Sequence, residues 1–129
     1  MKISFIIPMT QNLLASEANL SEHWSVKRKR HETQRFLVRS SFNFNAPESI
    51  PIPCTIRMTR IAPRQLDEDN LIASFKWIKD TIADFIVSGL PRGRADGNRK
   101  MTWHYSQQKR KPKEYALEIE IEYLPRQNI

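Results

Sequence analysis

The chain has 129 residues, 40% of them hydrophobic and 27% charged, which is the size and composition of one globular domain. Its single cysteine, Cys54, excludes an internal disulfide and a zinc site made from several cysteines. The net charge of +7 favours a polyanionic partner. The apolar run at residues 3–9 is too short for a secretory core, and no run approaches the ~20 residues that cross a bilayer. We therefore expect a cytoplasmic protein without a membrane partner, in which Cys54 is a small buried residue.

The first half of the chain predicts a strand, a helix and a second strand. Residues 2–9 are rich in Ile and Phe and predict a strand. Residues 21–40 predict a helix with Ser21 as its N-cap. After a turn-rich segment at residues 43–53, residues 54–61 alternate apolar and polar side chains, which is typical of a half-buried strand. The predicted helix also carries aromatic and basic side chains close to one stripe: Trp24, Arg28, His31, Arg35 and Arg39.

The second half predicts one long helix and two further strands. Apolar residues recur at helical spacing over residues 69–86, which predicts a helix there. Residues 88–100 contain all three glycines and predict a loop. Residues 101–106 and 115–124 predict two strands joined by a basic hairpin connection. The order β-α-β-α-β-β predicts a single α+β domain over residues 1–129, with a small mixed sheet of about four strands and two main helices.

The positive charge is concentrated in two segments. Residues 27–39 hold six Lys and Arg against one acid, and residues 92–113 hold eight against one, so these segments carry +5 and +7 and the rest carries −5. Clustered cations neutralise phosphates well, which favours a nucleic-acid partner, although a solubilising surface is the alternative. The residues that we expect to contact DNA are Lys27, Arg28, Lys29, Arg30, Arg94, Arg99, Lys100, Lys109, Arg110 and Lys111.

An acidic segment between the second strand and the second helix is the sharpest candidate site. It reads Asp67-Glu68-Asp69-Asn70. In an extended backbone Asp67 and Asp69 project to the same side, which suits shared binding of Mg²⁺, with Mn²⁺ as a substitute. The alternative is that Asp69 caps the helix while Asp67 and Glu68 offset its dipole. Lys76, two turns further along the predicted helix, lies on the same side as Asp69 and could meet a phosphate.

A third acid, Asp96, lies in the basic glycine-containing loop. It is either a third metal ligand among phosphate-binding arginines, or a charge partner or turn former. Phosphodiester hydrolysis uses the first arrangement, because metal ions activate water and cations neutralise the scissile phosphate.

The motif Leu-Asp-Glu-Asp-Asn-Leu at residues 66–71, followed by Ala73, Lys76 and Asp80, resembles the RusA family of Holliday-junction resolvases. Asn19, His23 and Trp24 are similar to early residues of its phage-type members, and residues 96–107 are similar to the segment with the third family aspartate. The resemblance covers about residues 4–123. Two departures are Ala95, where an acid often precedes that aspartate, and Ala73, where some members have the essential lysine.

The resemblance implies a homodimeric, Mg²⁺-dependent endonuclease that cuts four-way DNA junctions symmetrically in recombination and repair. It implies that Asp67, Asp69 and Asp96 are metal ligands and that Lys76 assists catalysis. The alternative function is a non-catalytic nucleic-acid-binding protein that retains the fold, and metal binding distinguishes the two. A third hypothesis is a protein-interaction module with solubilising charges, which salt-sensitive DNA binding would exclude.

Overall fold

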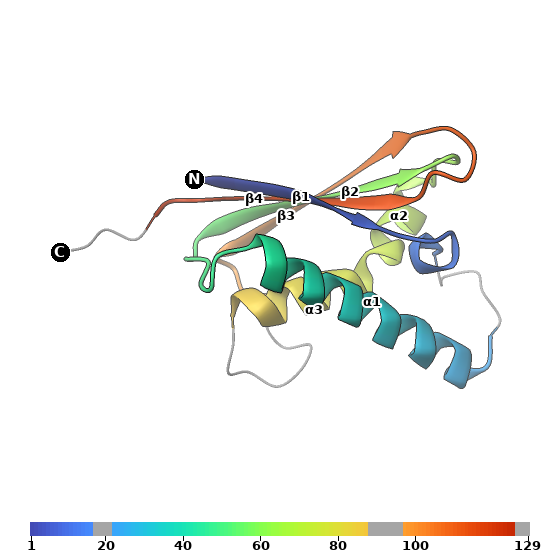
Figure 1. The fold of residues 1–129 in the computed structure, drawn as a ribbon, viewed down its shortest axis with the longest axis horizontal. Coiled ribbons are helices and arrows are strands. Elements are labelled where there is room, and N and C mark those ends of the chain that lie inside the picture. The colour runs from blue at the N-terminus through green and yellow to red at the C-terminus, as the bar shows by residue number, and fades with distance from the viewer. Residues whose placement is uncertain (17–21, 88–96, 126–129) are drawn as a thin grey trace.

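A computed structural model of the chain describes residues 1–16, 22–87 and 97–125. Four strands form one sheet, and the two longer helices cover one face of it (Figure 1). This confirms the predicted α+β domain with a small mixed sheet. The elements are β1 (Lys2–Pro8), the short 3₁₀ helix η1 (Asn12–Leu14), α1 (Trp24–Asn45), β2 (Cys54–Ala62), α2 (Glu68–Ser74), α3 (Lys76–Ile86), β3 (Met101–Lys109) and β4 (Ala116–Tyr123).

The strand order is β1-β4-β2-β3, with β2 and β3 parallel and the other two pairs antiparallel. Because β2 lies between β3 and β4, the predicted basic hairpin between the last two strands is wrong. The segment after β3 instead crosses the end of β2, where the Arg110 N–H donates to the Ala62 carbonyl at 3.1 Å. The central position of β4 buries its inward apolar side chains completely. The segment between β3 and β4 has several residues, which is long enough to pass over β2.

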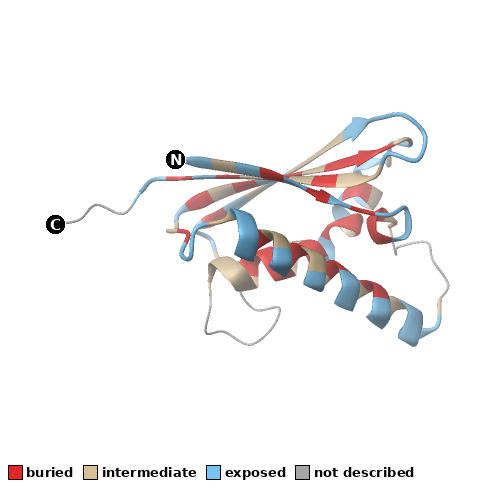
Figure 2. Cartoon of the chain, in the orientation of Figure 1, coloured by how far each residue is buried: buried red, intermediate tan, exposed pale blue. Residues whose placement is uncertain are grey.

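The core lies between the sheet and the helices. Buried residues alternate with intermediate or exposed ones along β1 and β4, as expected for a sheet covered on one face (Figure 2). Cys54 is 4% exposed, which confirms that it is a small buried residue, and burial raises the pKa of its thiol. The largest fully buried side chains are Phe42, Phe75, Ile7, Leu14, Ile56, Met58, Ile78, Ile82, Leu117, Ile119, Ile121 and Val38.

The predicted helix over residues 69–86 is broken into α2 and α3 at Phe75. This residue has φ −97° and ψ −5°, ends α2 and precedes α3. Its ring is fully buried and lies 5.8 Å from the ring of Tyr105. Burial of a large aromatic ring outweighs the modest gain from one continuous helix, because helix propensity is a weak preference.

Helix α1 begins and ends later than predicted. His23 is its N-cap, and the ring Nδ1 accepts a hydrogen bond from the Ser25 N–H at 3.2 Å; the predicted cap, Ser21, lies outside the described residues. The helix continues to Asn45, where Ala46 turns extended with ψ 154°. The residue before a proline disfavours the helical conformation, so Pro47 sets this end. Among the helices of the described residues, none combines the length and apolarity needed to cross a membrane.

Candidate functional site

The site is built at the edge of the sheet where two parallel strands end. Because β2 and β3 run in the same direction, their carboxyl ends meet at one edge, with Ala62 opposite Lys109. The loop that follows β2 leads to α2, and the segment that follows β3 crosses the same edge (Figure 1). We call residues 67–70 the acidic turn and residues 109–113 the basic connection. The topology therefore brings the acidic turn and one of the predicted cationic segments to the same end of the molecule.

Gln107 of β3 fixes the residue before the acidic turn. Its Nε2 donates to the Leu66 carbonyl at 2.7 Å, and its Oε1 accepts from the Leu66 N–H at 2.9 Å. Both the donor and the acceptor of one peptide residue are therefore satisfied by a single side chain. Sequence reasoning did not single out this role, because no local pattern links a glutamine to a backbone 41 residues away.

Asp67 is the N-cap of α2. Its Oδ1 accepts from the Asn70 N–H at 2.9 Å, and its Oδ2 accepts from the Asn70 Nδ2 at 3.0 Å. Asn70 is oriented in turn by Ser16, whose hydroxyl donates to Asn70 Oδ1 at 2.7 Å. The alternative to a metal site was that Asp69 caps the helix, but the N-cap of α2 is Asp67. The predicted extended backbone from Asp67 to Asp69 is wrong, because α2 begins at Glu68 and Asp69 is helical.

Asp69 lies in the first turn of α2 and is exposed. Its carboxylate forms no hydrogen bond or ion pair with any residue that the structure describes. Its carboxylate is consequently available for a cation, and each oxygen of Asp67 retains one lone pair beyond its bond to Asn70. Within residues 1–16, 22–87 and 97–125 no group of three or more His, Cys, Asp or Glu side chains is placed to hold a metal ion.

The other predicted catalytic residues are placed differently. Lys76 is exposed at the start of α3, beyond the break at Phe75, and its ammonium lies 5.1 Å from the ring centre of Trp77. The break at Phe75 separates it from α2, the helix that carries Asp69. Asp96 and Arg94 lie outside the described residues, as does Asn19.

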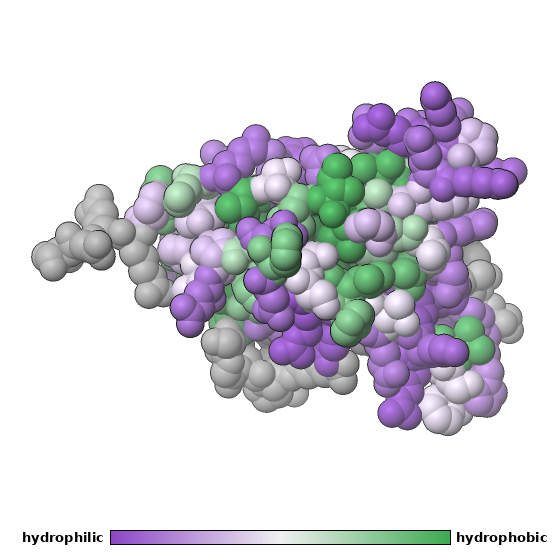
Figure 3. All heavy atoms as spheres, in the orientation of Figure 1, coloured by the Kyte–Doolittle hydropathy of each residue, from purple (hydrophilic) through white to green (hydrophobic). Residues whose placement is uncertain are grey.

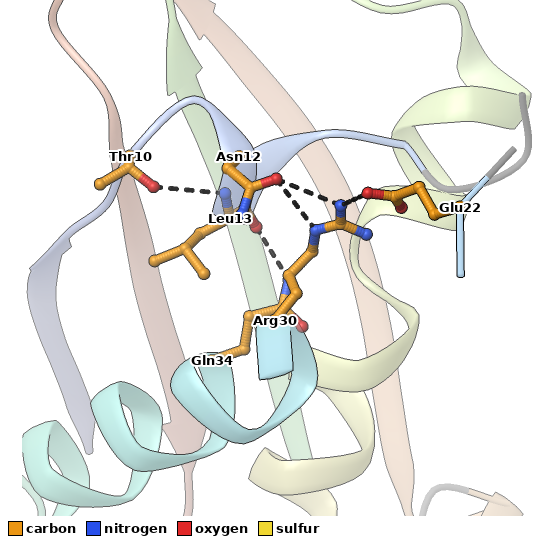
Figure 4. A network of polar contacts seen from close by, with 6 residues as sticks. All are labelled: Thr10, Asn12, Leu13, Glu22, Arg30 and Gln34. Atoms are coloured by element: carbon orange, nitrogen blue, oxygen red, sulfur yellow. Dashed lines mark hydrogen bonds and ion pairs between the residues drawn. The ribbon is translucent and has the colours of Figure 1, made fainter. Parts of the chain in front are cut away.

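The prediction that Arg30 contacts DNA is wrong, because this residue is buried. It is 3% exposed, and its Nη2 pairs with Glu22 Oε2 at 2.5 Å (Figure 4). Nη2 and Nε also donate to Asn12 Oδ1 at 3.1 and 3.3 Å. One turn later, Gln34 Nε2 donates to the Leu13 carbonyl at 2.8 Å. These contacts hold η1 against α1, so the Arg30 charge is used inside the protein.

The other described cations of the predicted set remain at the surface. Figure 3 shows hydrophilic residues gathered at the upper right, over the segment between β3 and β4, and at the lower right, over the beginning of α1. Arg28 pairs with Glu32 at 3.2 Å, and Lys27 is half-buried. The exposed cations of this set, besides Arg28, are Lys29, Arg99, Lys100, Lys109, Arg110 and Lys111.

A groove of about 450 Å³ between α1 and α3 contains part of the predicted α1 stripe. The rings of His31 and Trp77 stack there at 4.1 Å, and Trp24 is 64% exposed beside them. Lys27 and Arg28 also line it. The stacked rings of His31 and Trp77 pack α1 onto α3.

Comparison with known proteins adds no assignment: no protein-family model matches the chain, and no curated protein matches it.

Proposed function

We propose that this chain is a metal-dependent endonuclease that cleaves branched DNA, as the resemblance to RusA-family resolvases implies. The observation that carries the proposal is the acidic turn. Two exposed aspartates, one of them without a protein partner among the described residues, share a turn with the N-terminus of α2 at the edge crossed by the basic connection. A neutral or merely solubilising surface does not require acids and cations gathered in this way.

The donor set fits Mg²⁺, which usually takes one or two carboxylates and keeps several waters. Asp67 and Asp69 would hold the ion, with Asp96 as the third ligand implied by the resemblance. When bound, the ion would activate water and offset charge on the phosphate. The chain's own residues prepare this site: Asn70 orients the Asp67 carboxylate, and Gln107 fixes the backbone before it.

The basic connection supports a polyanionic substrate. Lys109, Arg110 and Lys111 are exposed beside the loop that leads to the acidic turn, and the backbone of Arg110 is bonded to the end of β2. Phosphates neutralised here would lie next to the acidic turn. Lys76, at the start of α3, would assist at the phosphate as the resemblance implies.

We also propose a homodimer, because two symmetric cuts require two sites and a two-fold dimer supplies them by construction. Helix α1 exposes two large apolar side chains, Phe36 and Phe44, of the kind that subunits bury. Light scattering should give twice the 15.2 kDa monomer mass at micromolar concentration. A monomer that persists at high concentration would count against this part.

A non-catalytic DNA-binding protein is the second candidate. It is favoured by Asp67, whose two oxygens already have a structural task in the helix cap, and by Ala73 in place of a lysine. The two functions differ in metal binding, since a purely structural cap has no need of Mg²⁺.

The test compares Asp69→Asn with Glu68→Gln in cleavage and gel-shift assays on a synthetic four-way junction. Both changes remove one exposed acid from the same helical turn, so they alter the helix dipole interaction and net charge equally. We expect Asp69→Asn to abolish cleavage while junction binding stays intact or strengthens, and Glu68→Gln to remain active. Equal activity in the two variants would contradict the metal-site assignment. Salt-sensitive binding without cleavage by the wild type would establish the second candidate instead.

A further inference from the structure

A second groove, of about 610 Å³, lies beside the acidic turn. Its walls come from the segment after β1, the loop after β2 and the segment that precedes β4. The described residues that line it include three cations and no acid. The lining side chains that carry charge or bond capacity are Arg60, Arg64, Lys113, Asn70, Ser16 and Tyr115. We call this the cationic groove.

Arg60 is the buried charge of this groove. It is 6% exposed, and its contacts are with neutral carbonyls: Nε donates to Leu14 at 3.0 Å and Nη1 to Arg64 at 2.6 Å. Among the described residues no carboxylate pairs with it. A guanidinium has five N–H donors, so donors remain beyond these two bonds. Burial lowers the pKa of Arg60, an effect that Tyr115 partly offsets.

Arg30 provides the comparison. It is the other buried arginine of the described chain, and it has a carboxylate partner in Glu22. Buried charges are ordinarily paired, because an uncompensated charge in a low-dielectric site is costly. Arg60 is also buried but has no such acid among the described residues, and it borders an open groove. An anion that binds in the groove would pair with the Arg60 guanidinium, as the Glu22 carboxylate pairs with that of Arg30.

The neighbouring cations point to the same ligand. Arg64 and Lys113 are exposed at the rim of the groove. Lys113 has a φ of 69°, a conformation that glycine or asparagine adopts more readily, so the backbone of this turn does not favour lysine. Arginine forks match the tetrahedral oxygens of phosphate well, and lysine adds a point charge.

Asn70 connects this groove with the acidic turn, since it lines the groove and donates to Asp67 Oδ2 at 3.0 Å. We infer that the cationic groove is a phosphate-binding site, and that it holds a backbone phosphate of bound nucleic acid adjacent to the one at the acidic turn. The second half of the inference rests on the proposed function, whereas the anion site does not. Free phosphate has the same chemistry, so the experiment must distinguish the two sources.

The first arm titrates inorganic phosphate against chloride of equal ionic strength, without metal, and follows the NMR signal of the Arg60 Nε–H. A saturable shift is expected in the wild type. The variant Arg64→Gln/Lys113→Gly removes two rim cations and leaves Arg60 and its carbonyl partners in place. It should weaken phosphate binding about tenfold, because hydrogen bonds to charged groups are stronger than neutral ones.

The matched control is Lys109→Gln/Lys111→Gln, which removes the same charge from the basic connection outside the groove. It should leave phosphate affinity within about twofold, because long-range surface charge is screened by salt. An unmoved Arg60 signal in the wild type, or equal weakening in the two double variants, would overturn the anion site.

The second arm adds a short DNA duplex to the phosphate-saturated protein, again without metal. We expect DNA to shift the same Arg60 signal and to displace phosphate. DNA that binds while phosphate stays in place would overturn the nucleic-acid half and leave a free-phosphate site. Neither arm depends on cleavage, so an inactive protein would refute the proposed nuclease without changing the reading of either titration.

Discussion

The paired hydrogen bonds between Gln107 and Leu66 make a quantitative prediction for Gln107→Ala. Two bonds of 2.7 and 2.9 Å are lost, and the half-buried Leu66 N–H and carbonyl lose their partner. At about 1 kcal/mol for each hydrogen bond, the variant should lose about 2 kcal/mol of unfolding free energy. For a domain of this size that corresponds to a fall in Tm of roughly 8 °C.

Gln108→Ala is the matched control, because the next side chain of β3 is exposed and bonds only to the Arg110 side chain at 3.3 Å. Urea and thermal unfolding of the two variants measure the difference. An equal, small loss in both would refute the reasoning that the Leu66 backbone is held by Gln107.

The same substitution tests whether Gln107 positions the acidic turn. The Mg²⁺ concentration for half-maximal cleavage should rise about tenfold or more, as for groups that orient metal ligands. Junction binding should be unchanged, because DNA binding is assigned to exposed Lys and Arg side chains and Gln107 carries no charge. A merely structural role would lower stability without moving the Mg²⁺ dependence.

Three further predictions follow from the site and the core. Asp67→Ala should cost about 1 kcal/mol of stability while Asp67→Asn costs little, because asparagine is an equally good N-cap; equal unfolding curves would contradict the cap's contribution. Alanine at the three cations of residues 109–111 should weaken binding to every DNA sequence alike and make the log–log salt slope shallower by up to about three units, and an unchanged slope would mean that they are only solvated. Cys54 should react with a thiol reagent only as the protein unfolds, since it is buried and its thiol pKa is raised; rapid labelling of the native protein would contradict this.

The strands could be predicted because alternation reports burial directly. Residues 115–124 alternate in sequence, and Leu117, Ile119 and Ile121 are indeed buried. The break at Phe75 could not be predicted in the same way, since an apolar stripe reports which face is buried and not whether the axis is continuous. Strand order also escaped prediction, because the pairing of β3 with β2 rather than β4 depends on contacts between distant segments.

The candidate site was only partly predictable for the same reason. The acidic motif identified the turn itself, whereas the choice of Asp67 over Asp69 as the cap depends on where α2 begins. Within a run of four cations, nothing local separates Arg30 from its neighbours, because its partner Glu22 is eight residues away and reaches it only in the fold. Arg60 is a single arginine within a strand, and nothing in the sequence distinguishes it. It becomes notable only in the fold, where it is buried and no carboxylate of the described residues pairs with it.

The most direct test of the proposed function is incubation of the wild-type protein with a synthetic four-way DNA junction and Mg²⁺, with a linear duplex of the same sequence and an EDTA-treated sample as controls. We predict paired cuts on opposite strands of the junction, little cleavage of the duplex and no cleavage in EDTA. Junction that is bound but stays intact with Mg²⁺ or Mn²⁺, or cleavage that persists in EDTA, would contradict a metal-dependent junction endonuclease.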